Sequence, residues 1–239
     1  KLKESIYMKK LLIVFLTSIV LTSSAAFAGS ISVGTKVSNA FIDASGTETT
    51  TAGTVTGGAA NTNSVEVDNM AIIPSIYVEY SLDSSVWGSD GNEVTFGVNY
   101  TYGEADVSDK ISSRSEVAED AAGSGSSGSV TYSANAEVEN YMNYYVEMPL
   151  SGAAYVKLGF SQIDVITKED QDHEGSYGDE TLDGVNYGVG FKGMYGNYQW
   201  KIAYEATDWD ELSLTSTTSN KITADLDVDE LAVSVGYRF

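Results

Sequence analysis

The amino-acid sequence predicts an all-β protein that folds as a closed antiparallel up-and-down transmembrane β-barrel of eight strands, with long extracellular loops and short periplasmic turns. Three observations support this prediction. Apolar residues recur at every second position after residue 30, where helical periodicity is nearly absent. The opposite face of these segments is small and polar with recurring Gly. The connections between the segments alternate between long and short.

The composition excludes several functional classes. The 239 residues include 13 Lys and Arg against 34 Asp and Glu, a net charge of −21, which would repel the phosphates of a nucleic acid. The absence of Cys removes disulfides, Cys-ligated metals and thiol catalysis, and a single His cannot build a multi-His site. Apolar residues at 42%, with 11% aromatic residues, favour a folded chain over a disordered one.

The N-terminal segment predicts export. Residues 1–7 precede the first Met, and we interpret them as an over-extended reading frame. Residues 8–28 have a basic start, an apolar stretch from Leu11 to Leu21 and a small-x-small site at residues 26–28, which is the pattern of a cleaved signal peptide. A membrane anchor is the alternative, but the apolar stretch is short for one. Residues 29–239 are then the barrel domain.

Eight segments alternate strongly enough to be strands. They lie at about residues 30–42, 70–82, 93–105, 134–148, 154–165, 183–193, 198–208 and 224–239. Each is at least as long as the roughly 9–11 residues with which a tilted strand crosses a membrane. The segments between them predict short turns at 149–153 and 194–197, a moderate one at 83–92, and long loops at 43–69, 106–133, 166–182 and 209–223.

This pattern of connections predicts the orientation of the barrel. Long and short connections in alternation, with an even number of strands, place both ends of the barrel in the periplasm. Pro74 is expected near the outer end of the second strand, where one lost ladder hydrogen bond matters least. Ten strands are an alternative if a loop forms a further hairpin beyond the membrane.

The last strand indicates which face meets lipid. Its bulky face consists of Leu231, Val233, Val235, Tyr237 and Phe239, and residues such as Ser234 and Gly236 alternate with them. A soluble sandwich rarely places Gly at every second position of its wet face, whereas space is short inside a narrow barrel. We therefore expect the bulky face to contact lipid, because only a closed barrel satisfies its backbone within hydrocarbon.

The same C-terminal run, which ends on the aromatic residue Phe239, resembles the assembly signal of outer-membrane β-barrels. Together with the export signal and the eight segments, it makes the chain similar to the small eight-stranded outer-membrane β-barrel family, the opacity-protein and outer-membrane-protein-A-like barrels. The resemblance implies a cell outer-membrane location, contact with outer-membrane lipids and lipopolysaccharide, and insertion by the assembly machinery with periplasmic chaperones. It implies no single activity, and we expect a monomer.

Charged residues alternate with the bulky face and are expected to point into the lumen, where isolated charges are costly and pairing is favoured. They are Glu79, Glu139, Glu147, Lys157, Lys192, Lys201, Glu205, Glu230 and Arg238. One interpretation is a network that plugs the lumen, and the other is a narrow selective pore. The plug is favoured because side chains nearly fill an eight-stranded interior.

The loops carry most of the acid, and no catalytic, cofactor or metal site is predicted in them. Residues 170–175 resemble half of a calcium loop, but the acid expected at the twelfth position falls one residue early. His173 is the single candidate base for a lipid-modifying enzyme, and nothing places a nucleophile beside it. We expect a structural or surface-interaction role carried by acidic loops. A narrow porin-like channel is the second hypothesis and an enzyme the third.

Overall fold

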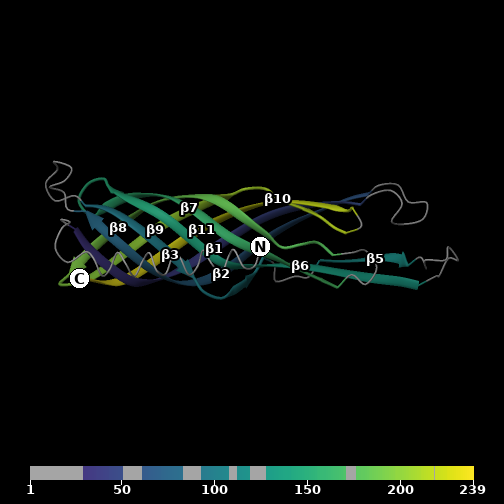
Figure 1. Cartoon of the computed structure of the whole chain (residues 1–239), viewed down its shortest axis with the longest axis horizontal. Coiled ribbons are helices and arrows are strands. Elements are labelled where there is room, and N and C mark those ends of the chain that lie inside the picture. The colour runs from purple at the N-terminus through teal and green to yellow at the C-terminus, as the bar shows by residue number, and fades with distance from the viewer. Residues whose placement is uncertain are drawn as a thin grey trace.

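The computed structural model describes residues 29–50, 61–82, 93–107, 112–118, 128–170, 176–217 and 219–239. The predicted signal peptide at 8–28, residues 1–7 and His173 lie outside these residues. The strands wind obliquely around a long cylinder, with the C-terminus near one end and β5 near the other (Figure 1). Within the described ranges, no helix is long and apolar enough to cross a membrane.

Eleven strands make up the described part of the chain. They are β1 (Gly29–Thr50), β2 (Asn61–Leu82), β3 (Val94–Thr101), β4 (Glu104–Asp106), β5 (Ser112–Ala118), β6 (Gly128–Pro149), β7 (Ala154–Asp170), β8 (Glu180–Tyr195), β9 (Tyr198–Trp209), β10 (Leu212–Thr215) and β11 (Lys221–Arg238). The tight turns between β6 and β7 and between β8 and β9 contain Gly152 and Gly196, whose φ values of 60° and 59° favour Gly.

The sheet closes on itself. Its order is β1-β2-β3-β6-β7-β8-β9-β11, every pair is antiparallel, and β11 also pairs with β1. The short strands β4 and β5 continue the position of β3 along β6, and β10 continues that of β9 along β11. Eight strand positions, not ten, therefore surround the barrel in the part that the structure describes. The predicted closed antiparallel barrel is confirmed.

Several strands are longer than the alternation predicts. Residues 43–50 and 61–69, expected in a long loop, form the outer parts of β1 and β2, which pair as far as Thr50 with Asn61. The pairing of β1 with β11 likewise continues to Thr49 and Lys221. The boundaries predicted from the apolar alternation are therefore wrong at this end, because the strands continue where their outward residues become polar.

Side chains reverse their character part-way along the cylinder. On the outer face of β11, Leu231, Val233 and Val235 give way to Asp229 and then to further acids at 227 and 225. The inner face changes in the opposite sense, with residues such as Glu230 at one end and Leu226 at the other. β1 changes between Phe41, which is exposed, and Ile42, which is buried. One half of the cylinder is therefore apolar outside, and the other half is apolar inside.

The half that is apolar inside has its own core. Buried side chains from five strands and from the segment before β8 form one cluster: Ile42, Ile163, Val165, Tyr177, Leu182, Leu212, Leu214 and Leu226. Burial of such side chains from water stabilises a β-structure in the way it does in a soluble protein. This core accounts for strands that continue beyond the apolar outer surface.

Two irregularities interrupt the wall. The strand at the third position breaks after Thr101, where Gly103 has a φ of 104°. Opposite this break, β6 contains a bulge between Glu139 and Met142, with Asn140 at a φ of 55°. A bulge inserts an unpaired residue and reverses the inside–outside alternation beyond it. The pocket described below lies beside this region.

Candidate functional site

A network of ion pairs fills the lumen of the half that is apolar outside. Lys36 Nζ lies 2.9 Å from carboxylate oxygens of both Glu205 and Glu230, and Lys157 Nζ lies 2.9 Å from Glu205. These side chains come from β1, β7, β9 and β11, so the network links opposite sides of the wall. The side chains of all four are at most 5% exposed.

A second group of ion pairs continues the network. Lys201 donates to Glu79 and to Glu147, the latter at 2.5 Å, and Lys192 donates to Glu147 at 3.0 Å. The hydroxyl of Tyr145 donates to Glu79 at 2.6 Å, while Lys157 lies 4.1 Å from the centroid of the Tyr145 ring. The two groups together hold four Lys and four Glu, so the charges within this network balance.

Small residues on the inner face leave room for tyrosine rings. A Cβ atom on Gly190 would lie 2.6 Å from the ring of Tyr155, and one on Gly34 would lie 2.5 Å from the ring of Tyr77. The ammonium nitrogen of Lys201 lies 5.7 Å from the centroid of the Tyr155 ring and 5.5 Å from the centroid of the Tyr77 ring. The recurring Gly thus lets the rings lie against the wall and shield the ion pairs.

The ion pairs and rings leave almost no open space. The cavity between them has a volume of about 10 Å³. A cavity needs roughly 10–15 Å³ to hold one water molecule, so a hydrated ion does not fit. We call the four Lys, the four Glu and the enclosing tyrosines the lumen plug, with the members Lys36, Lys157, Lys192, Lys201, Glu79, Glu147, Glu205, Glu230, Tyr77, Tyr145 and Tyr155.

Most of the charged residues predicted for the lumen lie in the plug, and two lie elsewhere. Arg238 is near the end of the barrel, where it pairs with Glu93 at 2.6 Å. Glu139 lies cross-strand from Glu104, on the face opposite Val138, which packs on the apolar core. Placing Glu139 in the lumen network was therefore wrong, because the bulge reverses the alternation above it.

Sequence reasoning missed Lys36, which bridges two carboxylates of the plug. The signal was present in the sequence, since Val33, Thr35 and Val37 alternate with Ser32, Gly34 and Lys36. The alternation around β1 places Lys36 on the small polar face. A strand whose outer face is less apolar therefore still indicates which of its residues face the lumen.

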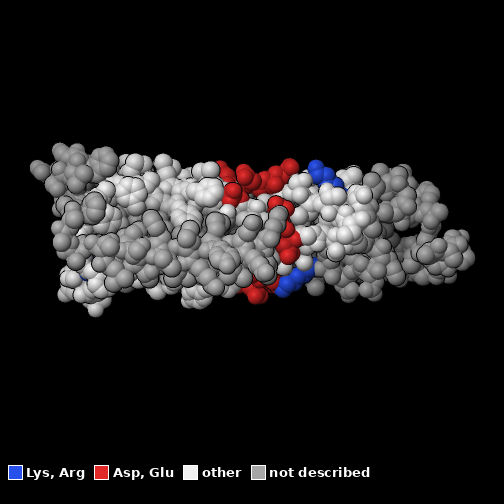
Figure 2. Space-filling view, viewed as in Figure 1, with Lys and Arg blue, Asp and Glu red and all other residues white. Residues whose placement is uncertain are grey.

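Acidic residues form a band on the outer surface where the exterior changes from apolar to polar (Figure 2). Four aspartates in it are direct cross-strand partners in one row: Asp68 with Asp43, Asp43 with Asp227, and Asp227 with Asp208. Like charges placed directly opposite each other are destabilising. The hydrogen bond with Asp68 and the repulsion from it raise the pKa of Asp43 above its usual value. We call this row the acid band.

A further acidic group lies beside the break in the wall. Carboxylate oxygens of Glu104, Glu137 and Glu139 lie within 4.8 Å of one another. Lys168 forms an ion pair with Glu137, and this contact raises the pKa of the lysine. An ammonium group thus already balances part of this negative charge.

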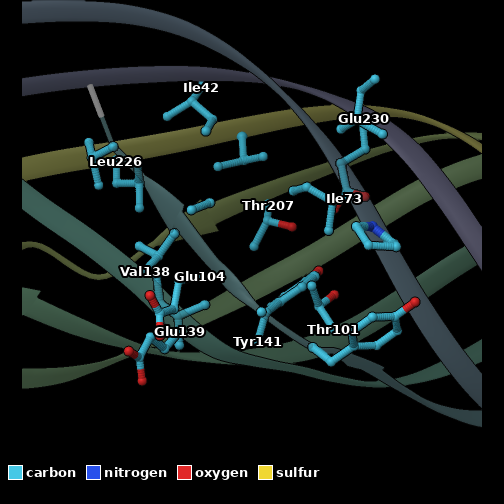
Figure 3. Close-up of a pocket in the computed structure, with 18 of the residues that line it drawn as sticks. Ile42, Ile73, Thr101, Glu104, Val138, Glu139, Tyr141, Thr207, Leu226 and Glu230 are labelled. Atoms are coloured by element: carbon cyan, nitrogen blue, oxygen red, sulfur yellow. The ribbon is translucent and has the colours of Figure 1, made fainter. Parts of the chain in front are cut away.

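An apolar pocket of about 90 Å³ adjoins the plug. Ile42, Leu226 and Val138 line it together with Tyr141, and Glu230 of the plug lies at one end (Figure 3). Polar atoms contribute little to this lining, in contrast to the space within the plug. The pocket therefore suits an apolar group better than an ion.

The predicted assembly signal lies along the outside of β11. Leu231, Val233 and Val235 are each 53% exposed, and Tyr237 packs edge-on against Phe239 with ring centroids 5.1 Å apart. The backbone N–H of Phe239 donates to the carbonyl of Ile31 at 2.9 Å. The terminal residue thus holds the closing β1–β11 seam, and its recognition by the assembly machinery stays a prediction.

Comparisons with known proteins give similar folds only. No protein-family model and no curated sequence matches the chain. The crystal structure of Ail, the attachment invasion locus protein of Yersinia pestis, is 12% identical with a TM-score of 0.39, over 88% of this chain and 97% of that one. The structure of the outer membrane protein AlkL is 18% identical with a TM-score of 0.42, over 91% of this chain and 93% of that one. The structure of the outer membrane protease OmpT of Escherichia coli is 11% identical with a TM-score of 0.42, over 91% of this chain and 100% of that one. None of these similarities supports an assignment of activity.

Proposed function

We propose that the chain is an integral outer-membrane β-barrel protein without a conducting lumen, with a structural or surface-interaction role outside the bilayer. The exterior of one half supports the membrane placement. Its outward side chains are apolar from Leu231 to Phe239 on β11, and mostly apolar from Ile31 to Phe41 on β1, where Thr35 and Asn39 are the polar exceptions. Stretches of this length match the roughly 9–11 residues with which a tilted strand crosses a bilayer.

The acid band supports a fixed depth in the membrane. A carboxylate in hydrocarbon is costly, so Asp43, Asp68, Asp208 and Asp227 favour a position in the headgroup region or in water. The apolar exterior on the other side of the band resists exposure to water. The two effects oppose movement of the barrel in either direction along the membrane normal.

The half beyond the acid band supports a role at the surface. From Asp43 to Thr50, β1 extends by roughly 23 Å along the strand at about 3.3 Å per residue. Pairing with β2 and β11 and the apolar core keep this part folded. It would carry the outer connections away from the lipid on a stable β-structure. Contact with lipopolysaccharide is part of this proposal.

The lumen plug is the observation that favours a structural role and argues against a channel. Its ion pairs join strands from several sides of the barrel, and the remaining space of about 10 Å³ holds no more than one water. Steady ion flow would require several of these buried pairs to break together. The plug thus favours a rigid barrel.

Conductance in planar lipid bilayers tests the proposal. Wild-type barrels, shown to be folded by their heat-modifiable gel mobility, are expected to give no steady openings. The double variant Lys157→Ala/Glu205→Ala removes the Lys157–Glu205 and Lys36–Glu205 ion pairs and serves as the comparison for a loosened plug. Lys168→Ala is the control outside the lumen. Steady wild-type openings would establish the porin-like alternative.

A further inference from the structure

The wall of the barrel has an incomplete seam between the second and third strand positions. β2 pairs with β3 from Leu82 to Ser75, yet it continues to pair with β1 as far as Asn61. Among the described residues, positions 70–74 of β2 have no strand partner on the side away from β1. Pro74 has no N–H to continue a ladder, and Gly103 turns the facing chain away.

Two sets of hydrogen bonds frame the gap. On one side, the hydroxyl of Thr101 donates to that of Ser75 at 3.2 Å. On the other side, the amide of Asn69 donates to the carbonyls of Asp106 and Val107, both at 3.4 Å. Residues 70–74 lie between these contacts. We call this framed gap the wall window.

The apolar pocket lies behind the wall window. Its lining includes Ile72 and Tyr102, which are 75% and 55% exposed on the outer surface, as well as Ile42 and Leu226, which are buried inside. A pocket lined from both faces passes through the wall. The lumen plug adjoins its inner end at Glu230. The pocket is thus open to the side, while the plug fills the lumen next to it.

The position of the wall window determines its surroundings. Asp68 of the acid band lies two residues before the segment 70–74 on β2, and the outward apolar residue Ile76 lies two residues after it. If the acid band lies at the headgroups, as in the proposed function on which this step rests, the window faces the outer boundary between headgroups and acyl chains. A molecule resting in that leaflet reaches it without crossing water.

The size and charge of the pocket restrict the occupant. A dry cavity of roughly 150 Å³ holds benzene, so a volume of about 90 Å³ suits a segment of a narrower linear chain. Glu104 and Glu139 line the pocket beside the gap, and no Lys or Arg is among its lining residues. These carboxylates repel an anionic head and tolerate an uncharged or cationic one.

We propose that the wall window is a binding site for one linear alkyl chain of a single-chain amphiphile in the outer leaflet, with an uncharged or cationic head. The chain enters between Ile72 and Tyr102 and lies against Ile42 and Leu226. The head stays beside Glu104 and Glu139. Because the plug adjoins the pocket, this is a site of binding and not a path across the membrane.

Fluorescence quenching of Trp209, which lines the pocket, tests the proposal. The variant Trp87→Phe/Trp200→Phe leaves Trp209 as the single Trp of the full barrel domain. In vesicles of a zwitterionic phospholipid, ω-bromodecanol is expected to quench this Trp in a saturable manner, since bromine quenches at contact. The matching carboxylate, ω-bromodecanoate at neutral pH, is expected to bind about tenfold more weakly at equal concentration in the membrane.

Filling the pocket supplies the decisive comparison. Ala105→Phe, in the pocket lining, is expected to weaken the saturable quenching by at least about tenfold. Leu158→Phe adds bulk on the lipid-facing surface and is expected to change nothing. Ile73→Phe fills the pocket from β2 and replaces Ala105→Phe if that variant lacks the gel mobility of a folded barrel.

Each outcome decides one part of the proposal. Quenching that never saturates, or that survives in the filled variant, overturns the site. Equal binding of the carboxylate overturns the assignment of the head. Saturable quenching in a barrel that conducts steadily would leave this site standing while the proposed non-conducting function fails.

Discussion

Replacing Lys201 by Met is the sharpest test of the lumen plug. Lys201 lies between Glu79 and Glu147, and the side chains of all three are at most 5% exposed. Methionine keeps much of the volume and removes the charge. Glu147 retains Lys192 as a partner, whereas Glu79 keeps only the neutral donors Tyr145 and Gln199 among the described contacts.

The expected loss of folding free energy follows from the buried charge of Glu79, which has no cationic partner left among the described contacts. Removing one partner of a buried ion pair leaves an uncompensated charge and costs about 3–5 kcal/mol. Lys168→Met breaks the ion pair with Glu137, in which the lysine side chain is 51% exposed, and is expected to cost less than about 1 kcal/mol. The double variant Lys201→Met/Glu79→Gln should be more stable than Lys201→Met alone, because a neutral amide needs no counter-charge.

Urea unfolding in lipid vesicles, followed by tryptophan fluorescence and gel mobility, measures these free energies. Lys201→Met, Glu79→Gln, their double variant, Lys168→Met and wild type are compared at one pH and in one lipid. Equal losses for Lys201→Met and Lys168→Met would refute the reasoning. So would a double variant whose loss equals the sum of its single losses, since Glu79 and Lys201 would then be uncoupled.

Three further predictions follow from the exterior. Val189→Arg on the apolar surface of β8 is expected to cost about 2–4 kcal/mol if it lies near the midplane of the bilayer, and Ser45→Arg beyond the acid band almost nothing; equal urea stabilities would contradict the membrane placement. Because the pKa of Asp43 is raised in the folded state, its contribution to stability falls as pH rises through that pKa; Asp43→Asn should therefore be more stable than wild type at neutral pH and lose this advantage in acid, as thermal melting would show. Deleting Phe239 removes its hydrogen bond to Ile31 and is expected to lower the yield of assembled barrel in cells more than the urea stability of the folded barrel; a proportionate loss of both would argue against an assembly signal.

Local alternation was enough to predict the barrel wall. On β8, Val185, Tyr187 and Val189 face outward while Gly188 and Gly190 face inward, as the pattern indicated. The pleat of a strand forces neighbouring side chains to opposite faces, so this information is local and readable. The change of the exterior from apolar to acidic is also visible in the sequence, because outward Leu231 is followed toward the loop end by outward Asp229.

Other features depended on contacts between distant residues. The bulge that moves Glu139 to the outer face, and the break at Gly103 beside Pro74, arise where neighbouring strands stop matching in register. Which carboxylates Lys36 bridges is likewise set by strands 169 residues or more apart in the chain. No single segment carries that information.

The amino-acid sequence by itself determined the eight-stranded alternation, the charged character of the inner face and the bulky outer face, because each follows from two-residue periodicity along one strand. Only the tertiary structure decided the pairing within the plug, the apolar core beyond the acid band and the opening in the wall. These features arise from barrel closure, which sets the register between strands and so determines which side chains meet across the lumen.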